Sequence, residues 1–450
     1  MTYQEFKEAV IRYAVENGIA DYELYYEGGW SDSVEIYKEE VKGYTTEENM
    51  GVCFRCIIGG KAGYASTENL TEEEARSLVS RALENAGSIE SEEECFIHKK
   101  GDSYAVCEKN DSPRPSGAEL VETALALQKE LYRADRRVVD GTQAYIVYGS
   151  QKYALCNSNG LDLEDEFSMA NSYGMAIVED NGEMYDGFKV KDGRTIQELD
   201  LKEIAGEAVE EAVSTIGAGS IPSGKYTVVF SNKAMATLLA TYSSVFSAEQ
   251  AQKGMSLLKD KEGEKIAADI VTITDDPRYK DSMVKRTFDG EGVAAYAKNV
   301  VENGVLATLL HNLKTAAKAG VKSTGNASKA SYSSVVGVSP FTFYLHPSQG
   351  EGSALEDIFR AAGEGLYITD LEGLHAGANP VSGDFSLSSK GFLITEGKKG
   401  APVKNITVSG SFFELLKKVE IIGNDLELLR GKFGSPAILV RDMAVAGKDI

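Results

Sequence analysis

The amino-acid sequence predicts an α+β fold: a duplicated helix-strands-helix N-terminal half with an antiparallel sheet, followed by a glycine-rich, curved or barrel-like β domain with flanking helices. Repeated helix-start signals and the β-rich segments between them predict the first half. Short β-rich segments punctuated by glycine, of which the chain has 45, predict the second half. The expected domains are residues 1–110, 111–220 and 221–450.

Four helix starts divide the N-terminal half into two similar units. Each start pairs a hydroxyl or carboxylate side chain with a glutamate three residues later, which is the spacing of a capping box. The four pairs are Thr2 with Glu5, Thr71 with Glu74, Ser116 with Glu119, and Asp200 with Glu203. Apolar residues recur with helical spacing behind each start. The economical explanation is two helix-strands-helix units, near residues 1–87 and 116–217.

Strands and turns are expected between the helices of each unit. Residues 34–37 and 144–148 have a β-rich composition, whereas 49–51 and 157–160 have the Asn and Gly content of turns. The acidic run 92–94 and the proline-containing stretch 111–115 are predicted to connect the two units.

Beyond Ile221 the pattern changes to shorter segments. A strand of the buried type is expected at residues 226–230, and glycine-punctuated β segments at 391–395, 406–410 and 437–440. Helices are expected at residues 234–246, 354–362 and 412–418. This alternation favours a curved or barrel-like sheet with helices packed against it.

Composition and charge limit the classes of function. The 450 residues are 42% hydrophobic and 26% charged, which is typical of a globular protein with a large core. No apolar run approaches the roughly 18–20 residues of a membrane-spanning helix, and the polar N-terminus does not resemble a signal peptide. We therefore expect a cytoplasmic protein. The net charge of −22 argues against direct binding of nucleic acid, which relies on Lys and Arg.

The five cysteines indicate reduced thiols, because their number is odd and their spacing irregular. Cys53 and Cys56 form a lone C-x-x-C pair in a predicted strand, where residues three apart point to opposite faces. With Cys95, His98 and Cys107 they could be imagined as a zinc cluster, but a closed structural site normally pairs two such motifs. Buried or half-buried thiols are the preferred interpretation.

A series of short segments in the C-terminal half carries a resemblance to a known family. In chain order they are Phe288–Val293, Glu302–Leu306, Lys322–Asn326, Pro380–Ser386 and Ile421–Asp425. With these segments the chain resembles the TldD/PmbA family of bacterial zinc-peptidase-related proteins over nearly its whole length. Members of this family have also carried the label of modulators of DNA gyrase. Its catalytic branch bears a His-Glu-x-x-x-His motif on a helix and a cysteine ligand near the C-terminus.

The segment that matches the metal-binding helix of the family holds no metal ligands. Ala240 and Val245 stand at the two histidine positions, and Thr241 stands at the glutamate position. No cysteine follows Cys156. Because alkyl side chains have no lone pair for Zn²⁺, the resemblance points to the PmbA/TldE-like branch, with no catalytic residues, no bound metal and no cofactor in this chain.

The resemblance implies a role in proteolysis that depends on another chain. PmbA-like members pair with TldD-like catalytic subunits, which mature or degrade peptides and unfolded polypeptides. The implied function is therefore a metal-free subunit of a TldD-type metallopeptidase system. Its implied partners are a TldD-like subunit and a peptide, with a homodimer when the chain is isolated, and neither nucleic acid nor membrane. The alternative is a stand-alone peptide-binding or scaffold protein.

A glycine-rich loop contains the remaining candidate residues, which are His375, Asn379 and Asp384. Such a loop could bring an imidazole, an amide and a carboxylate together to hold a peptide or to transfer a proton. Local hydrogen bonds that shape the loop are the preferred interpretation. An independent hydrolase that uses His375 is a third possible function, although the chain has no Gly-x-Ser-x-Gly motif.

Overall fold

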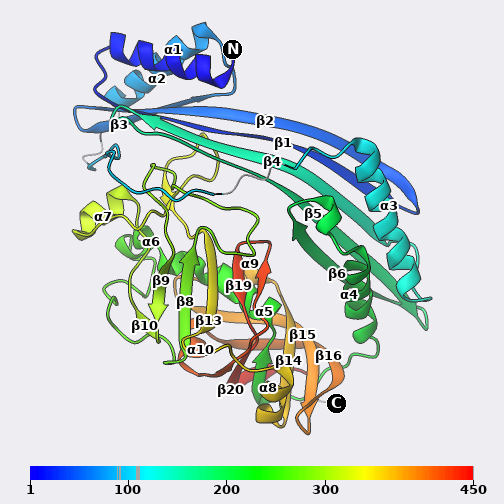
Figure 1. Cartoon of the computed structure of the whole chain (residues 1–450). Coiled ribbons are helices and arrows are strands. Elements are labelled where there is room, and N and C mark those ends of the chain that lie inside the picture. The colour runs from blue at the N-terminus through cyan, green and yellow to red at the C-terminus, as the bar shows by residue number, and fades with distance from the viewer. Residues whose placement is uncertain (89, 91–92, 108–111, 449–450) are drawn as a thin grey trace.

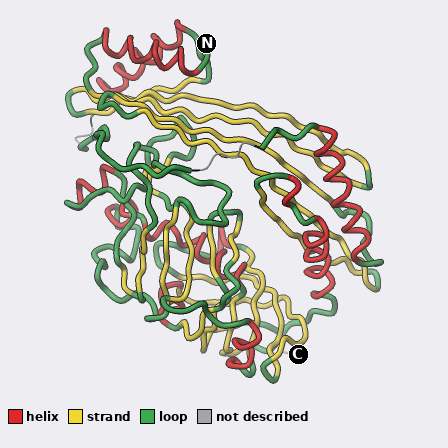
Figure 2. The backbone as a smooth tube through the Cα atoms, viewed as in Figure 1, coloured by secondary structure: helices red, strands yellow, loops and turns green. Residues whose placement is uncertain are grey.

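The computed structural model describes residues 1–88, 90, 93–107 and 112–448, and it has two parts (Figure 1, Figure 2). A long, curved antiparallel sheet with two pairs of helices forms the N-terminal half. A closed barrel and a second sheet form the C-terminal half, below the first sheet in the view of Figure 1. No helix in the described ranges is long and apolar enough to cross a membrane.

The N-terminal half uses one helix-strands-helix unit twice, which confirms the predicted duplication. The two units join through β1 and β4, in the strand order β3-β2-β1-β4-β5-β6. The first unit comprises α1 (Tyr3–Glu16), β1 (Asp21–Tyr37), β2 (Glu40–Ile58), β3 (Lys61–Thr67) and α2 (Glu72–Ser88). The second comprises α3 (Gly117–Ala134), β4 (Gln143–Asn157), β5 (Asp162–Asp180), β6 (Glu183–Gly193), the 3-10 turn η1 (Ile196–Glu198) and α4 (Leu201–Ser214).

The helices begin at the predicted caps. Thr2 and Ser116 each form a complete capping box with the glutamate three residues later. Asp200 accepts hydrogen bonds from two backbone amides of the first turn of α4, and Thr71 accepts one from the amide of Glu74. These bonds satisfy amides that have no partner inside the helix, so each cap fixes where its helix starts.

The duplication extends to the packing of each second helix on its edge strand. A Cβ on Gly63 of β3 would lie 1.9 Å from the carbonyl oxygen of Ala82 in α2. A Cβ on Gly187 of β6 would lie 2.2 Å from the carbonyl oxygen of Ala208 in α4. In both units, glycine on the strand and alanine on the helix let the two backbones approach closely.

We expect Gly187→Ala to lower the free energy of unfolding by about 1–3 kcal/mol, because α4 must move away from β6 to admit the methyl group. The matched control is Gly206→Ala in α4, where a Cβ would have no heavy atom within 4 Å. The control should raise stability by about 0.5–1 kcal/mol, as alanine does in helices. Urea unfolding followed by circular dichroism measures both changes. Equal effects of the two substitutions would contradict the close packing.

The first hairpin differs from its prediction. The turn predicted at residues 49–51 is wrong, because these residues lie inside β2 and pair with β1. The chain turns instead at Lys38 and Glu39, which have φ angles of 53° and 59°. A two-residue hairpin turn requires such positive φ angles, and Asn-Gly or Asp-Gly usually supplies them. The turn predicted at residues 157–160 is present between β4 and β5.

The two helix pairs lie on one face of the sheet, at opposite ends. Leu24 of β1 packs with α1 and α2, whereas Val34 of the same strand packs with α3 and α4. The two residues share a face because side chains alternate along a strand. Between the helix pairs, Arg114 lies 4.0 Å from the ring centroid of Trp30 and so holds the segment before α3 on the sheet.

A closed five-stranded barrel forms the centre of the C-terminal half, which confirms the expected barrel-like domain. Its strand order is β16-β15-β14-β7-β20, and β16 pairs with β20 to close it. Only β7 and β14 are parallel neighbours within this ring. The strands are β7 (Gly224–Phe230), β14 (Gly365–Glu372), β15 (Asp384–Thr395), β16 (Lys398–Ser411) and β20 (Ile438–Ala446), with β17 (Val419–Ile422) added beside β20. The predicted helices at 354–362 and 412–418 are α8 (Leu355–Ala362) and α10 (Phe412–Lys417).

A second sheet lies beside the barrel, in the order β10-β9-β8-β13-β19-β18. Its strands are β8 (Val271–Asp276), β9 (Lys298–Glu302), β10 (Val305–Leu306), β13 (Thr342–Pro347), β18 (Glu427–Leu429) and β19 (Phe433–Ser435). A separate pair consists of β11 (Ala327–Ser328) and β12 (Gly337–Val338), and short helices are α6 (Ala248–Gln252), α7 (Leu313–Ala319) and α9 (Leu374–Gly377). The domain boundary predicted between residues 110 and 111 lies outside the described residues. Residue 92 of the predicted connector also lies outside them. The three-domain division stays a prediction.

Candidate functional site

The helix predicted to match the metal-binding helix of the resembled family lies between the barrel and the second sheet. This helix, α5 (Asn232–Tyr242), continues into the 3-10 turn η2 (Ser243–Phe246). The Ser231 hydroxyl caps it by accepting from the Ala234 amide at 3.1 Å. Apolar side chains such as Met235 and Leu238 are fully buried, because α5 packs against β7 and β14 on one side and β13, β18 and β19 on the other.

The two positions predicted as vacant ligand sites, Ala240 and Val245, and the predicted vacant glutamate position, Thr241, have different environments. Ala240 is half-buried near the end of α5, whereas Val245 lies in η2 and is 1% exposed within the main hydrophobic core. The Thr241 hydroxyl donates to the backbone carbonyl of Thr237 at 2.8 Å, as threonines in helices often do. None of these side chains offers a zinc donor of the usual kind, so this helix does not fit a bound Zn²⁺. That Ala240 and Val245 replace metal ligands and Thr241 replaces the glutamate stays a prediction.

The loop with the other candidate residues contacts the end of α5. Tyr242 donates from its hydroxyl to the backbone carbonyl of Asp384 at 2.6 Å. Its ring stacks on Phe412, with centroids 4.6 Å apart and planes 6° from parallel. Burial raises the pKa of Tyr242 to about 12, so the hydroxyl stays a donor at neutral pH. Sequence reasoning identified the helix and the loop separately, and the structure joins them through the Tyr242 side chain.

Of the three candidate residues in this loop, only Asn379 makes the local side-chain hydrogen bonds that the preferred interpretation predicts. The Asn379 side-chain oxygen accepts from the amides of Val381 and Ser382, which makes a tight turn. His375, in α9, and Asp384 are exposed. Among the described contacts, neither the His375 ring nor the Asp384 carboxylate has a hydrogen-bond partner. The loop therefore presents two exposed polar groups beside α5 without a preorganised catalytic pair.

The described residues contain no group of three or more His, Cys, Asp or Glu side chains that could hold a metal ion. All five cysteines are free thiols, and Cys53 and Cys56 are buried in β2. Burial raises the pKa of Cys56 to about 11, which keeps it a thiol. His98 contacts Asp102 at 2.9 Å instead of a cysteine. The preferred interpretation of buried and half-buried thiols agrees with these environments.

Buried charges join the first unit of the sheet to the C-terminal half, and the sequence analysis missed them. Arg55 of β2 donates to Glu23 of β1 at 3.1 Å and to Glu291 at 3.3 Å, and all three side chains are at most 4% exposed. Asp289 accepts hydrogen bonds from three backbone amides. Burial, and then the nearby charge of Glu291, raise the pKa of Asp289 to about 7.

A second buried network lies beside the first. Asp275 of β8 is fully buried and accepts from Lys298 at 3.0 Å and from the Asn326 side chain at 2.7 Å. Asn326 belongs to one of the family-like segments, and Asp289 and Glu291 belong to another. One of the segments that carry the resemblance, Phe288–Val293, therefore lies at the junction between the two halves of the chain.

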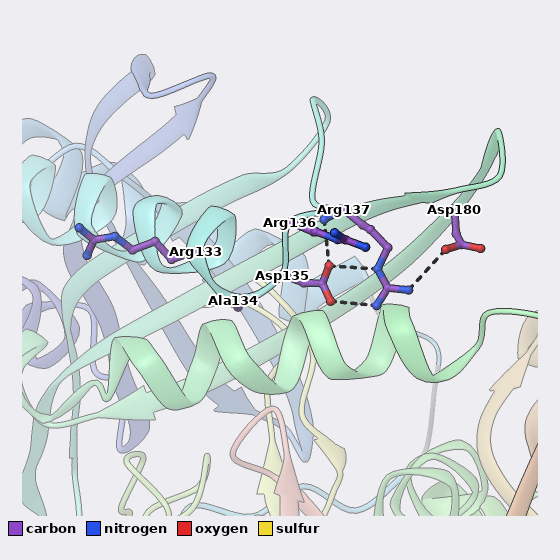
Figure 3. A pocket seen from close by; sticks show the side chains of 6 residues that line it. All are labelled: Arg133, Ala134, Asp135, Arg136, Arg137 and Asp180. Atoms are coloured by element: carbon purple, nitrogen blue, oxygen red, sulfur yellow. Dashed lines mark hydrogen bonds and ion pairs between the residues drawn. The ribbon is translucent and has the colours of Figure 1, made fainter.

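The pocket shown in Figure 3 lies on the second unit, at the ends of α3 and β5, and has a volume of about 570 Å³. Arg137 lies between Asp135 at 2.8 Å and Asp180 at 3.4 Å, so one guanidinium pairs with two carboxylates. The residues that line the pocket are Arg133, Ala134, Asp135, Arg136, Arg137 and Asp180. The pocket contains no nucleophile paired with a base.

Fold and site together define a class: a two-part α+β protein with a duplicated sheet and a barrel, whose central helix lacks metal-binding side chains. Three family domains match the chain in order. The PmbA/TldA metallopeptidase domain 1 matches residues 22–86, the central domain matches 110–216 and the C-terminal domain matches 223–447. The chain belongs to the TldD/PmbA family of metallopeptidase-related proteins.

Individual relatives agree with this assignment. An uncharacterized protein of Methanocaldococcus jannaschii is 30% identical over 445 residues, covering 96% of this chain and 98% of its own. The metalloprotease PmbA of Escherichia coli O157:H7 is 25% identical over 334 residues, covering 73% and 70%. The crystal structure of a Thermotoga maritima protein, described as a candidate modulator of DNA gyrase, has a TM-score of 0.90 and 32% identity over 99% of this chain and 100% of that one.

Proposed function

We propose that this chain is a PmbA/TldE-like, metal-free subunit of a TldD-type metallopeptidase system. The observation that carries the proposal is the chemistry of α5 and η2, where Ala240, Thr241 and Val245 provide no zinc donor and no carboxylate base. A zinc peptidase needs the metal to polarise the peptide carbonyl and a base to take the proton from water. Catalysis therefore depends on a TldD-like partner, and this chain contributes structure or substrate contacts in the cytoplasm.

Peptides and unfolded polypeptides are the proposed substrates of the complex. The outer edges of the N-terminal sheet are poor places for them to add as an extra strand. The Asn85 side chain donates to the carbonyl of Tyr64 on β3, and the Glu211 carboxylate accepts from the amide of Phe188 on β6. Each edge thus has a backbone group occupied by the helix that follows. The exposed loop around His375 is the proposed place of substrate contact.

Mixing the purified chain with a TldD-like protein from the same organism is expected to give a stable complex and new peptide cleavage. The chain alone should cleave no peptide and should hold less than about a tenth of an equivalent of zinc, because it lacks the ligands. Size-exclusion chromatography, a fluorogenic peptide assay and metal analysis measure these outcomes. A zinc chelator should abolish cleavage by the complex.

Two alternatives predict different results in the same experiment. A stand-alone peptide-binding or scaffold protein would form no complex and would add no cleavage. An independent hydrolase would cleave peptides alone, would resist the chelator, and would lose activity in His375→Ala. Under the proposed function, His375→Ala leaves complex formation intact and at most weakens peptide binding.

A further inference from the structure

Three buried side chains beside the second sheet contact one another: Lys298, Asp275 and Asn326. Lys298 of β9 is the cross-strand partner of Asp275 of β8, and Asn326 lies directly before β11. Asp275 and Asn326 are fully buried, and the Lys298 side chain is 6% exposed. The fold thus holds an amine, a carboxylate and an amide together, shielded from water.

The hydrogen bonds among the three place each group for a reaction between the amine and the amide. The Lys298 ammonium donates to Oδ1 of Asn326 at 3.1 Å, so it lies at the carbonyl group that a free amine would attack. A single oxygen of Asp275, Oδ2, accepts from Nζ of Lys298 at 3.0 Å and from Nδ2 of Asn326 at 2.7 Å. One carboxylate oxygen therefore contacts both the nucleophile and the leaving group, as a proton carrier must.

The surroundings of the three groups favour this reaction. The Thr324 hydroxyl donates to Oδ1 of Asn326 at 2.8 Å, which is the shorter of its two contacts with acceptors. Negative charge would develop on this oxygen as the amine adds, and a donor held there stabilises it. The Tyr296 ring centroid lies 4.6 Å from Nζ of Lys298. Because a buried charge is costly, the transfer of one proton to Asp275 gives an uncharged amine in a site that suits it.

We propose that Lys298 and Asn326 join in an intramolecular isopeptide bond, with Asp275 carrying the protons. The bond between Nζ of Lys298 and Cγ of Asn326 forms, and the bond between Cγ and Nδ2 breaks. Asp275 passes two protons in turn from Nζ to Nδ2, so the leaving group departs as ammonium and Asp275 ends as a carboxylate. Nothing is oxidised or reduced, and the reaction needs no co-reactant.

The isopeptide bond is independent of the proposed function and acts on the stability of the fold. It closes a loop between residues 28 positions apart, which restricts the unfolded chain as a disulfide does. The amide of Ala327, the next residue after Asn326, donates to Asp289 at 2.9 Å. The bond therefore anchors a family-like segment, Lys322–Asn326, beside the buried charges at the junction of the two halves.

The test is the intact mass of the purified full chain, 48.5 kDa, under denaturing conditions. The wild type should be lighter than the mass of its sequence by about 17 Da, because attack by the amine expels one ammonia. Tandem mass spectrometry after trypsin should find the peptides of Lys298 and Asn326 joined. Lys298→Arg, whose guanidinium stays protonated, should have the full mass of its sequence. The matched control, Lys7→Arg, changes another buried lysine with a carboxylate partner, Asp162 at 3.0 Å, and should keep the loss.

Three other outcomes would overturn the proposal or a defined part of it. A wild-type chain with the full mass of its sequence shows that the bond does not form, and the proposed function then stands unchanged. A loss of ammonia that maps to an Asn-Gly step such as Asn303–Gly304 is cyclisation of the backbone, and it rules the bond out as well. A joined peptide in an Asp275→Asn variant that circular dichroism shows to be folded removes Asp275 from its role as the proton carrier. The wild-type mass decides the first two outcomes whether or not any variant folds.

Discussion

Replacing Arg55 by methionine is expected to lower the free energy of unfolding by about 3–5 kcal/mol, which is the usual cost of removing one partner from a buried ion cluster. Arg55 neutralises Glu23 and Glu291 at a point where no side chain is more than 4% exposed. Methionine fills much of the volume but leaves two carboxylates without a counter-charge. Burial already raises the pKa of Glu291, so ionising it without Arg55 would cost still more. Urea unfolding at neutral pH measures the loss.

The control for this substitution lies on the same strand. Lys42→Met removes an ion pair with Glu35 whose partners are 52% and 31% exposed, and it should cost no more than about 1 kcal/mol. Combining Arg55→Met with Glu291→Gln should recover part of the stability, because one unpaired charge disappears with it. If Arg55→Met costs no more than Lys42→Met, water reaches the cluster and its charges do not hold the two halves together.

The helices of the N-terminal half were predictable because their signals are local. A cap such as Thr2 with Glu5 lies within one turn, and the apolar stripe behind it needs only helical spacing. The first hairpin was not predictable in the same way, because Lys38 and Glu39 adopt positive φ angles, which lysine and glutamate rarely do. There the long pairing of β1 with β2 decides the turn, and tertiary structure overrides local preference.

The candidate site shows the same division between local and distant information. The sequence shows directly that α5 carries apolar residues in the segment predicted to match the metal-binding helix. The contact between Tyr242 and Asp384 was not predictable, because the two residues lie 142 positions apart. The sequence did not predict the ion pair of Arg55, because its partner Glu291 lies 236 residues away. Sequence patterns give the periodicity of single elements, whereas long-range pairing of charges depends on how the whole chain folds.

Stability should fall as pH rises from about 4 to 7 through the titration of Asp289. Its pKa is about 7 in the fold against an ordinary 3.8, so in this range the folded chain keeps a proton that the unfolded chain has released. The folded state binds more protons there, and the free energy of unfolding therefore decreases with pH. A shift of about three pKa units corresponds to up to about 4 kcal/mol. The contribution is complete below pH 4 and lost above pH 7.

Asp289→Asn isolates the contribution of Asp289 to the pH dependence of stability, because asparagine does not titrate and every other residue is unchanged. The difference in unfolding free energy between wild type and variant, measured in urea at half-unit steps from pH 4 to 8, should shrink as pH rises. Glu291 leaves a residual slope of the same sign in the variant, since burial raises its pKa as well. The opposite trend, a wild-type advantage that grows with pH, would mean that the three backbone amides hold Asp289 ionised in the fold. The two trends separate burial from hydrogen bonding as the dominant influence on this carboxyl group.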